Sequence, residues 1–183
     1  TSGQLGQGDA VTQSFPTQVG TATDWASVTV GGLHACGIRG TALYCWGENG
    51  DGQLGDGGTT DRYAPVQIAA GTSWSSVVAG GTHTCALTTA SALYCWGDNS
   101  HSQLGDGGTT DLSTPTRIGT ATWTKLALGA FFSCGVQATT AGSLWCWGEN
   151  EDGQLGVGSV VDKTSPTRIG ALTTWTDVVA GDA

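Results

Sequence analysis

The chain has 183 residues, of which 31 are glycine and only 11% are charged. Six basic residues against 15 acidic ones give a net charge of −9, which argues against nucleic acid as a partner, because neutralising phosphates needs clustered Lys and Arg. No apolar run approaches the ~20 residues of a membrane span, so we expect no membrane insertion.

Four copies of one pattern follow each other along the chain. Each copy begins at a Gln-Leu-Gly anchor, and the anchors are Gln4, Gln53, Gln103 and Gln154. Each anchor is followed by a proline (Pro16, Pro65, Pro115, Pro166) and then a tryptophan (Trp25, Trp74, Trp123, Trp175). A Cys-Trp-Gly follows the first three tryptophans, at Cys45, Cys95 and Cys146. A repeat this short cannot bury an apolar face alone, so residues 1–183 should form one array with no separate second domain.

The second unit shows the expected elements most clearly. Residues 74–79 and 82–87 are short and β-branched or alternating, which predicts two strands separated by a Gly-Gly turn. A third strand is expected at 92–96 and a brief fourth at 115–118, with proline as its first residue, where no ladder donor is lost. Applied to all copies, including Pro16 and Trp175, the pattern predicts fourteen strands. Four short antiparallel strands per unit, with no helical period, indicate an all-β chain of propeller blades.

The six cysteines form three local pairs. These are Cys36/Cys45, Cys85/Cys95 and Cys134/Cys146. Each pair should face across a hairpin, where the Cα separation of opposed residues suits a disulfide. Zinc is the alternative, because His34 and His83 each precede a cysteine by two residues, but the third unit has Phe132 in that position. We favour disulfides, and such regular pairs point to an oxidising compartment: secreted or cell-surface.

The three histidines are the candidates for catalysis. Because the chain itself replaces the His34 and His83 position with Phe132, we interpret both as packed between units. His101 stands alone in a loop and is expected at a solvated tip. No nucleophile elbow, phosphate loop or His-Glu-x-x-His occurs. The sequence therefore predicts no catalytic residue, no cofactor site and no enzyme.

The glycine loops carry regularly placed carboxylates. Calcium is a weak possibility at Asp51, Asp56, Asp106 and Asp152, because carboxylates in glycine loops can hold this ion. The spacing does not match the EF-hand loop, and Asp-Gly and Asn-Gly are also ordinary turn formers. We favour turns, and expect no metal site.

The tryptophans of the Cys-Trp-Gly elements are expected to pack unit against unit. They are Trp46, Trp96 and Trp147. The third unit also has Trp145 where the other units have Tyr44 and Tyr94, which indicates local repacking.

Taken in order, the elements of one unit resemble a known repeat. Gly-x-x-His-x-Cys-x-Leu, Leu-Tyr-Cys-Trp-Gly-x-Asn, Gly-Gln-Leu-Gly-x-Gly and then Pro are similar to the RCC1 repeat (regulator of chromosome condensation), more narrowly its cysteine-bearing bacterial form. The resemblance implies blades of a seven-bladed propeller. The chain holds about three and a half repeats, so we expect it to be part of a larger propeller or assembly.

These features favour a non-enzymatic, extracellular protein-binding or assembly module of a bacterium. The expected partner is a protein, either another copy of the chain or further repeats. Three alternatives stay open. Open-ended blades could stack into a fibre as structural subunits. The resemblance also implies an inhibitor of a secreted enzyme, or guanine-nucleotide exchange on a small GTPase. Exchange fits less well, because the anchors lie 49, 50 and 51 residues apart and leave no room for an inserted wedge.

Overall fold

The computed structural model describes residues 2–138 and 142–182, and the secondary-structure elements of this part are all β-strands. The eleven strands are β1 (Trp25–Val30), β2 (His34–Arg39), β3 (Ala42–Gly47), β4 (Arg62–Ile68), β5 (Trp74–Ala79), β6 (His83–Thr88), β7 (Ala92–Gly97), β8 (Leu112–Leu128), β9 (Phe132–Gln137), β10 (Ser143–Gly148) and β11 (Lys163–Arg168). The all-β prediction is confirmed. Among the described residues no helix could cross a membrane.

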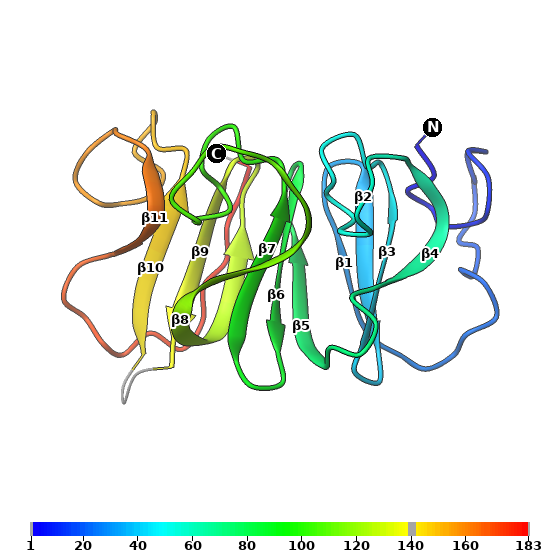
Figure 1. The fold of residues 1–183 in the computed structure, drawn as a ribbon, viewed down its shortest axis with the longest axis horizontal. Coiled ribbons are helices and arrows are strands. Elements are labelled where there is room, and N and C mark those ends of the chain that lie inside the picture. The colour runs from blue at the N-terminus through cyan, green and yellow to red at the C-terminus, as the bar shows by residue number, and fades with distance from the viewer. Residues whose placement is uncertain (1, 139–141, 183) are drawn as a thin grey trace.

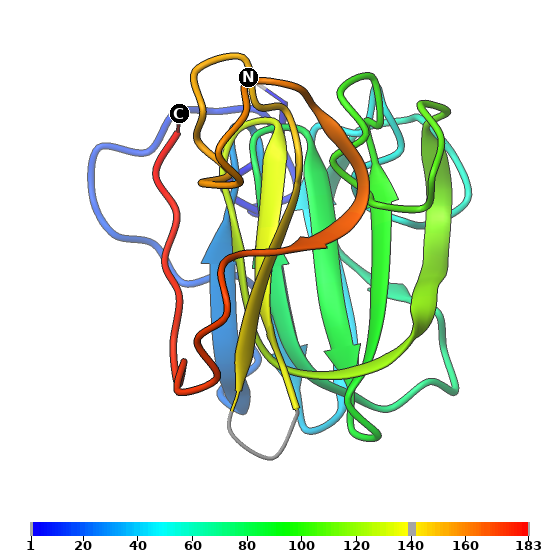
Figure 2. The same ribbon diagram turned by 90° about the vertical axis from the view of Figure 1, so that its left-hand side faces the viewer.

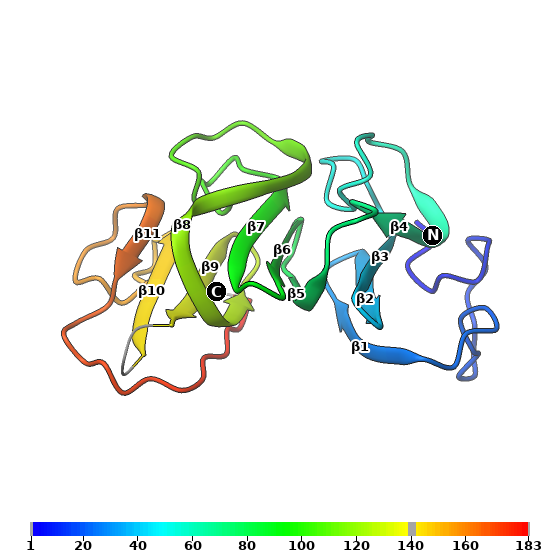
Figure 3. The same ribbon diagram turned by 60° about the horizontal axis from the view of Figure 1, so that its bottom comes forward.

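The strands form three antiparallel blades set side by side (Figures 1 and 3). Blade 1 is the sheet β1-β2-β3-β4. Blades 2 and 3 share one seven-stranded sheet, because β8 pairs with β7 at its start and with β9 at its end. Blade 2 therefore consists of β5, β6, β7 and the first half of β8, and blade 3 of the second half of β8 with β9, β10 and β11. The sheets do not close into a ring.

Two of the predicted strands were wrong. No strand forms at Pro16. The other proline strands pair with a Cys-Trp-Gly strand that lies before them in the chain, and the described residues before Pro16 contain no such strand. No strand forms at Trp175 either. Its segment runs beside blade 3 with isolated backbone hydrogen bonds, from Trp175 N to Gly142 O (3.3 Å) and from Ala130 N to Asp182 O (3.1 Å). Of the predicted array 1–183, residues 1, 139–141 and 183 lie outside the described residues.

The position of the prolines also differs from the prediction. Pro65 is the fourth residue of β4, not the first. The pairing register shifts between Cys45 and Gly47, so the residues around Pro65 form an irregularity opposite Trp46. A proline costs no ladder bond at such a bulge, which is why the strand can begin before it.

The hydrophobic core lies between blades. Between blades 1 and 2 the core consists of residues from one face of blade 1, Leu54 of the loop after β3, and residues of blade 2. Blade 1 contributes Cys36, Ile38, Leu43, Cys45 and Ile68, and blade 2 contributes Trp74, Val77, Ala86 and Trp96. The same arrangement recurs between blades 2 and 3 around Trp123 and Trp147. Each fully buried Leu or Ile contributes about 1.5–3 kcal/mol. Blade-to-blade packing of the tryptophans, as predicted, therefore supplies much of the stability.

Three disulfides cross the central hairpins. They join Cys36 to Cys45, Cys85 to Cys95 and Cys134 to Cys146, each with a Cα–Cα distance of 4.1 Å. The described residues contain no free cysteine. The pairing is the one predicted, because opposed residues of a hairpin are brought together by local structure alone. Disulfides of this kind are consistent with an extracellular protein.

Candidate functional site: the acidic loops at one end of the blades

Three long loops lie at the same end of the three blades (Figures 1 and 2). They follow β3, β7 and β10 and cover residues 48–61, 98–111 and 149–162, and we call this surface the loop end. Eleven of the 15 acidic residues of the chain belong to these loops. Any partner that approaches this end meets a concentration of negative charge.

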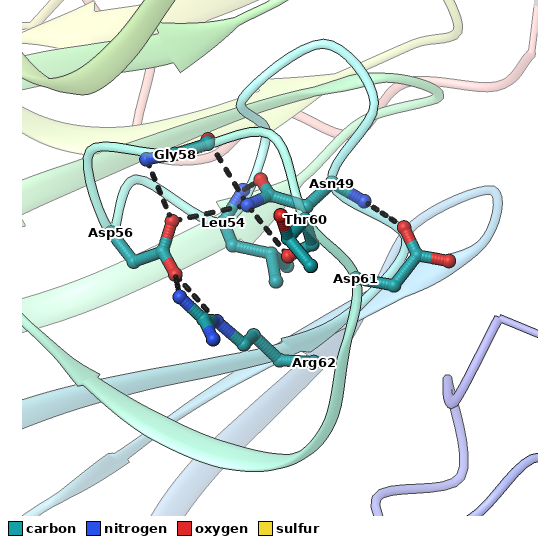
Figure 4. A network of polar contacts seen from close by, with 7 residues as sticks. All are labelled: Asn49, Leu54, Asp56, Gly58, Thr60, Asp61 and Arg62. Carbon is teal, nitrogen blue, oxygen red and sulfur yellow. Dashed lines mark hydrogen bonds and ion pairs between the residues drawn. The ribbon is translucent and has the colours of Figure 1, made fainter.

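A buried asparagine holds each loop. In the first loop the Asn49 amide nitrogen donates to Asp56 Oδ1 (3.0 Å), Gly58 O (3.1 Å) and Thr60 O (3.1 Å). Its side-chain oxygen accepts from Leu54 N at 3.0 Å. Asp61 Oδ1 accepts from the Asn49 backbone N–H, also at 3.0 Å. Figure 4 shows how these contacts tie the loop around one side chain.

The same arrangement recurs in the other two loops. Asn99 donates to Asp106, Gly108 and Thr110 and accepts from Leu104. Asn150 donates to Ser159 and Val161 and accepts from Leu155, but Val157 stands where a carboxylate would accept a further bond. All three asparagines are fully buried. Moving a buried amide whose nitrogen and oxygen are both hydrogen-bonded would break several bonds at once. The asparagines therefore hold the loops in one conformation.

The first and second loops also support the next blade through their Gln-Leu-Gly anchors. The carbonyl oxygen of Gln53 accepts from Trp96 Nε1 (3.0 Å) and from Thr84 Oγ1 (2.8 Å), both in blade 2. Gln103 does the same for Trp147 and Ser133 of blade 3. These two anchors thus tie the first loop to blade 2 and the second loop to blade 3.

The two buried histidines continue this network. His34 Nε2 lies 2.9 Å from Thr84 Oγ1, and His83 Nε2 lies 2.9 Å from Ser133 Oγ. Both hydroxyls donate to an anchor carbonyl, so they accept from the imidazole and place its proton on Nε2. Burial lowers the pKa of His34 to about 4. It lowers the pKa of His83 to about 3, with His34 adding to the effect. Both rings are therefore neutral packing groups between blades.

His101 is not a freely solvated tip. Its Nδ1 lies 3.6 Å from Glu149 Oε1, and its ring centroid is 5.0 Å from that of Phe131. The contact links the second loop to blade 3, because Phe131 directly precedes β9 and Glu149 directly follows β10. The prediction missed it since the pairing joins residues almost fifty positions apart.

The four candidate calcium residues have different environments. Asp56 accepts from Asn49 and Gly58 and forms an ion pair with Arg62, and Asp106 accepts from Asn99 and Gly108. Asp152 is exposed. Burial raises the pKa of Asp51, and the nearby carboxylates of Asp98 and Asp111 add to the rise. In the described part of the chain no three His, Cys, Asp or Glu side chains are grouped to hold a metal ion.

The pKa of Asp56 shows how firmly this carboxylate is held. Its burial would raise the pKa, but hydrogen bonds from Arg62, the Gly58 N–H and Asn49 outweigh burial and leave the pKa below its usual value. Asp56 therefore stays ionised as a structural partner of the loop.

The family model of the regulator of chromosome condensation (RCC1) repeat matches residues 42–87, 91–136 and 141–183. A second model of the same repeat matches residues 74–103 and 123–154. The chain belongs to the RCC1 repeat family. The predicted resemblance to the RCC1 repeat is confirmed, and its narrower form, the cysteine-bearing bacterial type, stays a prediction. No curated protein matches the chain.

Solved structures with the RCC1 fold share the architecture. Prp20p of Saccharomyces cerevisiae, described with its binding to Gsp1p and histones, is 22% identical with a TM-score of 0.78, over 93% of this chain and 45% of that one. A second structure of yeast RCC1 (Prp20), bound to Kap60, has 22% identity and a TM-score of 0.77, over 93% and 43%. Human WBSCR16 has 17% identity and a TM-score of 0.58, over 99% and 64%. The chain spans less than half the length of the yeast proteins.

Two hydroxyl–imidazole pairs lie between the RCC1 units. The pairs His34–Thr84 and His83–Ser133 look superficially like a base with a nucleophile. However, all four side chains are buried, and each hydroxyl gives its proton to a backbone carbonyl and not to the imidazole. An imidazole whose pKa is lowered this far is also a poor base near neutral pH.

Proposed function

We propose that this RCC1-repeat chain is a non-enzymatic protein-binding module that acts outside the bacterial cell and binds its partner through the loop end. The observation that carries the proposal is the set of three acidic loops, each held around a buried asparagine. Rigid loops bind with little loss of conformational entropy, and their charge steers a basic partner toward them.

Three further observations support this function. The fold neighbour Prp20p, the yeast RCC1, is described in two structures as binding other proteins. The disulfides support a place outside the cytosol. The hydroxyl–imidazole pairs are buried, which supports the absence of enzymatic activity.

The test is capture of a partner from the medium of the source organism, followed by affinity measurements with the purified partner. The variant Glu151→Gln/Asp152→Asn removes two exposed charges from the third loop. The control Asp24→Asn removes one charge at the opposite end of blade 1, beside Arg39. We expect the first variant to weaken binding roughly tenfold and salt to weaken it further, whereas the control leaves it unchanged. Equal affinity of all three proteins would refute the proposal.

Assembly with another RCC1 blade is a second candidate function. Val28 and Val30 of β1 are 66% and 73% exposed, whereas Val77 and Ala79, their counterparts in β5, are 7% and 8% exposed beneath blade 1. The same type of face is thus covered between blades 1 and 2 and uncovered on the outer side of blade 1. A blade of the same kind, from a second copy or from further repeats, fits this face.

A further inference from the structure

A groove lies on the outer side of blade 1. It has a volume of about 520 Å³ and is lined by residues of blade 1 and of the segment 2–24, which lies at the end of the row of blades (Figure 1). Its apolar lining consists of Leu5, Phe15, Val19, Val28, Val30 and Trp46. An apolar groove of this kind indicates a place for a partner.

Four of these lining residues have counterparts in the core between blades 1 and 2. The pairs, which occupy the same positions of the repeat, are Leu5 and Leu54, Val19 and Ile68, Val28 and Val77, and Trp46 and Trp96. In the core these counterparts surround one hairpin, β2–β3, through its side chains Cys36, Ile38, Leu43 and Cys45. In the groove the hairpin is missing, because the described residues before Trp25 form no strand. Leu54 is accordingly fully buried, whereas Leu5 is 43% exposed.

The missing part is a hairpin and not a complete blade. Residues 2–24 already supply the elements that follow the hairpin in a repeat, namely an anchor at Gln4 and a proline segment at Pro16. The anchor is in place, because the Gln4 carbonyl accepts from Trp46 Nε1 at 3.0 Å. Two antiparallel strands between this segment and β1 would therefore restore the arrangement found between blades 1 and 2.

Ala35 gives the groove a preference. It lines the groove, is 2% exposed, and takes the position that Thr84 has in blade 2. The Thr84 hydroxyl lies 2.9 Å from Nε2 of His34, which belongs to the preceding hairpin. Ala35 has no hydroxyl, so a histidine in that position of an incoming hairpin would bury its N–H without this acceptor. An apolar ring fits better, and the chain itself has Phe132 at this position of β9.

We propose that the groove binds a β-hairpin of a partner protein, closed by a cystine. The hairpin carries an aliphatic residue two positions inside each cysteine, as Ile38 and Leu43 are placed in blade 1, and an aromatic residue two positions before the first cysteine. The inference rests on the second candidate function and names the part of the partner that meets blade 1. Val28 and Val30, now exposed, would then be covered as Val77 is beneath blade 1.

The probe is a peptide of residues 82–97, the hairpin of blade 2, oxidised at its two cysteines and carrying His83→Phe. It is titrated into the oxidised 183-residue chain, with affinity measured by calorimetry and the site located through valine methyl signals in NMR spectra. The peptide should shift the signals of Val28 and Val30. The same peptide with its natural His83 should bind roughly tenfold more weakly, because its buried N–H lacks an acceptor. The control peptide Leu87→Asp/Leu93→Asp should not bind, because it would bury two charges.

Variants of the chain complete the test. Ala35→Ser supplies the hydroxyl that Ser133 provides in blade 3, so it should strengthen binding of the His83 peptide and remove the preference for phenylalanine. Val28→Lys/Val30→Glu should abolish binding of both peptides. The matched control Val160→Lys/Val161→Glu, in the third loop, should leave their affinities unchanged.

Three results would overturn the inference: no binding of either peptide, equal affinity of the two for the natural chain, or a preference that Ala35→Ser does not change. Shifts confined to Val179, which is 89% exposed near the other end of the chain, would also overturn it. Failure of the peptides together with self-association that Val28→Lys/Val30→Glu disrupts would leave the assembly function standing. Conversely, peptide binding by a chain that stays monomeric at every concentration would support the inference and refute self-association.

Discussion

Trp96 donates its indole N–H to the backbone carbonyl of Gln53, 43 residues earlier in the chain. The glycine that follows in the anchor, Gly55, lies against the same indole, so that an added Cβ would be 2.6 Å from Trp96 Nε1. Trp46 and Trp147 contact the anchors at Gln4 and Gln103 in the same way. The Gln-Leu-Gly anchor and the tryptophan of the Cys-Trp-Gly strand thus form one contact between successive units, which we call the joint.

Substitution of the anchor glycine should break this joint. A Cβ on Gly105 would lie 2.6 Å from Trp147, and its φ of +75° strains any other residue. Gly105→Ala should lower the free energy of unfolding by about 3 kcal/mol, from backbone strain plus overpacking. Gly107→Ala is the control, because its φ is +94° but nothing lies within 4 Å of the added atom. Urea unfolding of Gly107→Ala should show a loss of only about 1 kcal/mol in the free energy of unfolding. Equal losses for the two variants would mean that the contact between the anchor glycine and the tryptophan does not stabilise the fold.

The buried asparagines should not tolerate a carboxylate. In Asn99→Asp the amide that donates to Asp106, Gly108 and Thr110 becomes a carboxylate. This carboxylate faces the negatively charged side chain of Asp106. We expect a loss of about 3–5 kcal/mol by urea unfolding at neutral pH. Asn150→Asp should cost less, because its loop has Val157 in place of the facing carboxylate. A larger loss at Asn150 than at Asn99 would mean that the carboxylate neighbour is unimportant.

Stability should fall as the pH drops below about 6.5. The pKa of His34 is lowered to about 4 and that of His83 to about 3, from 6.5. Between these values the unfolded chain binds protons that the folded chain does not, so each histidine costs about 1.4 kcal/mol per pH unit. His34→Phe/His83→Phe follows the natural Phe132 and should flatten the slope between about pH 6 and about pH 5. An unchanged slope would mean that the two rings are protonated in the folded protein. The variant should also leave partner affinity nearly unchanged.

The disulfides should be both protected and stabilising. Cys85 and Cys95 are fully buried, so reductant should cleave their bond slowly in the native state and quickly in urea. On the chain-entropy model, closing a loop as short as these adds about 2–3 kcal/mol. Intact mass with and without reductant, peptide mapping and thermal melts of both forms provide the measurement. Free thiols in the unreduced protein, or cystines that join different units, would contradict the assignment.

The chain should associate in solution through its uncovered blade face. Analytical ultracentrifugation over a range of concentrations should show species heavier than the 18.5 kDa monomer. Val28→Lys/Val30→Glu places opposite charges on the exposed face of β1 and should shift the distribution toward monomer. The matched control is Val160→Lys/Val161→Glu in the third loop, where both valines are also exposed. A compact, cooperatively melting monomer at every concentration would show that these blades are stable alone.

The sequence by itself determined the features that depend on neighbours in the chain. The period of the anchors, the hairpin strands such as β6 and β7 and the three disulfides all follow from local patterns, because a hairpin brings Cys85 and Cys95 together whatever lies around it. Glycine turns, alternation and the absence of a helical period were enough to predict an all-β fold.

Only the tertiary structure decided the features that need a partner from another unit. A strand at Pro16 or Trp175 requires a neighbouring strand to bond its backbone, and periodicity alone does not supply one. The sequence placed Asp56 and Asp106 in equivalent loops, but only Asp56 has an ion-pair partner among the described residues. Arg62 reaches it when the loop folds back around Asn49, whereas Leu112 occupies the equivalent strand position after the second loop.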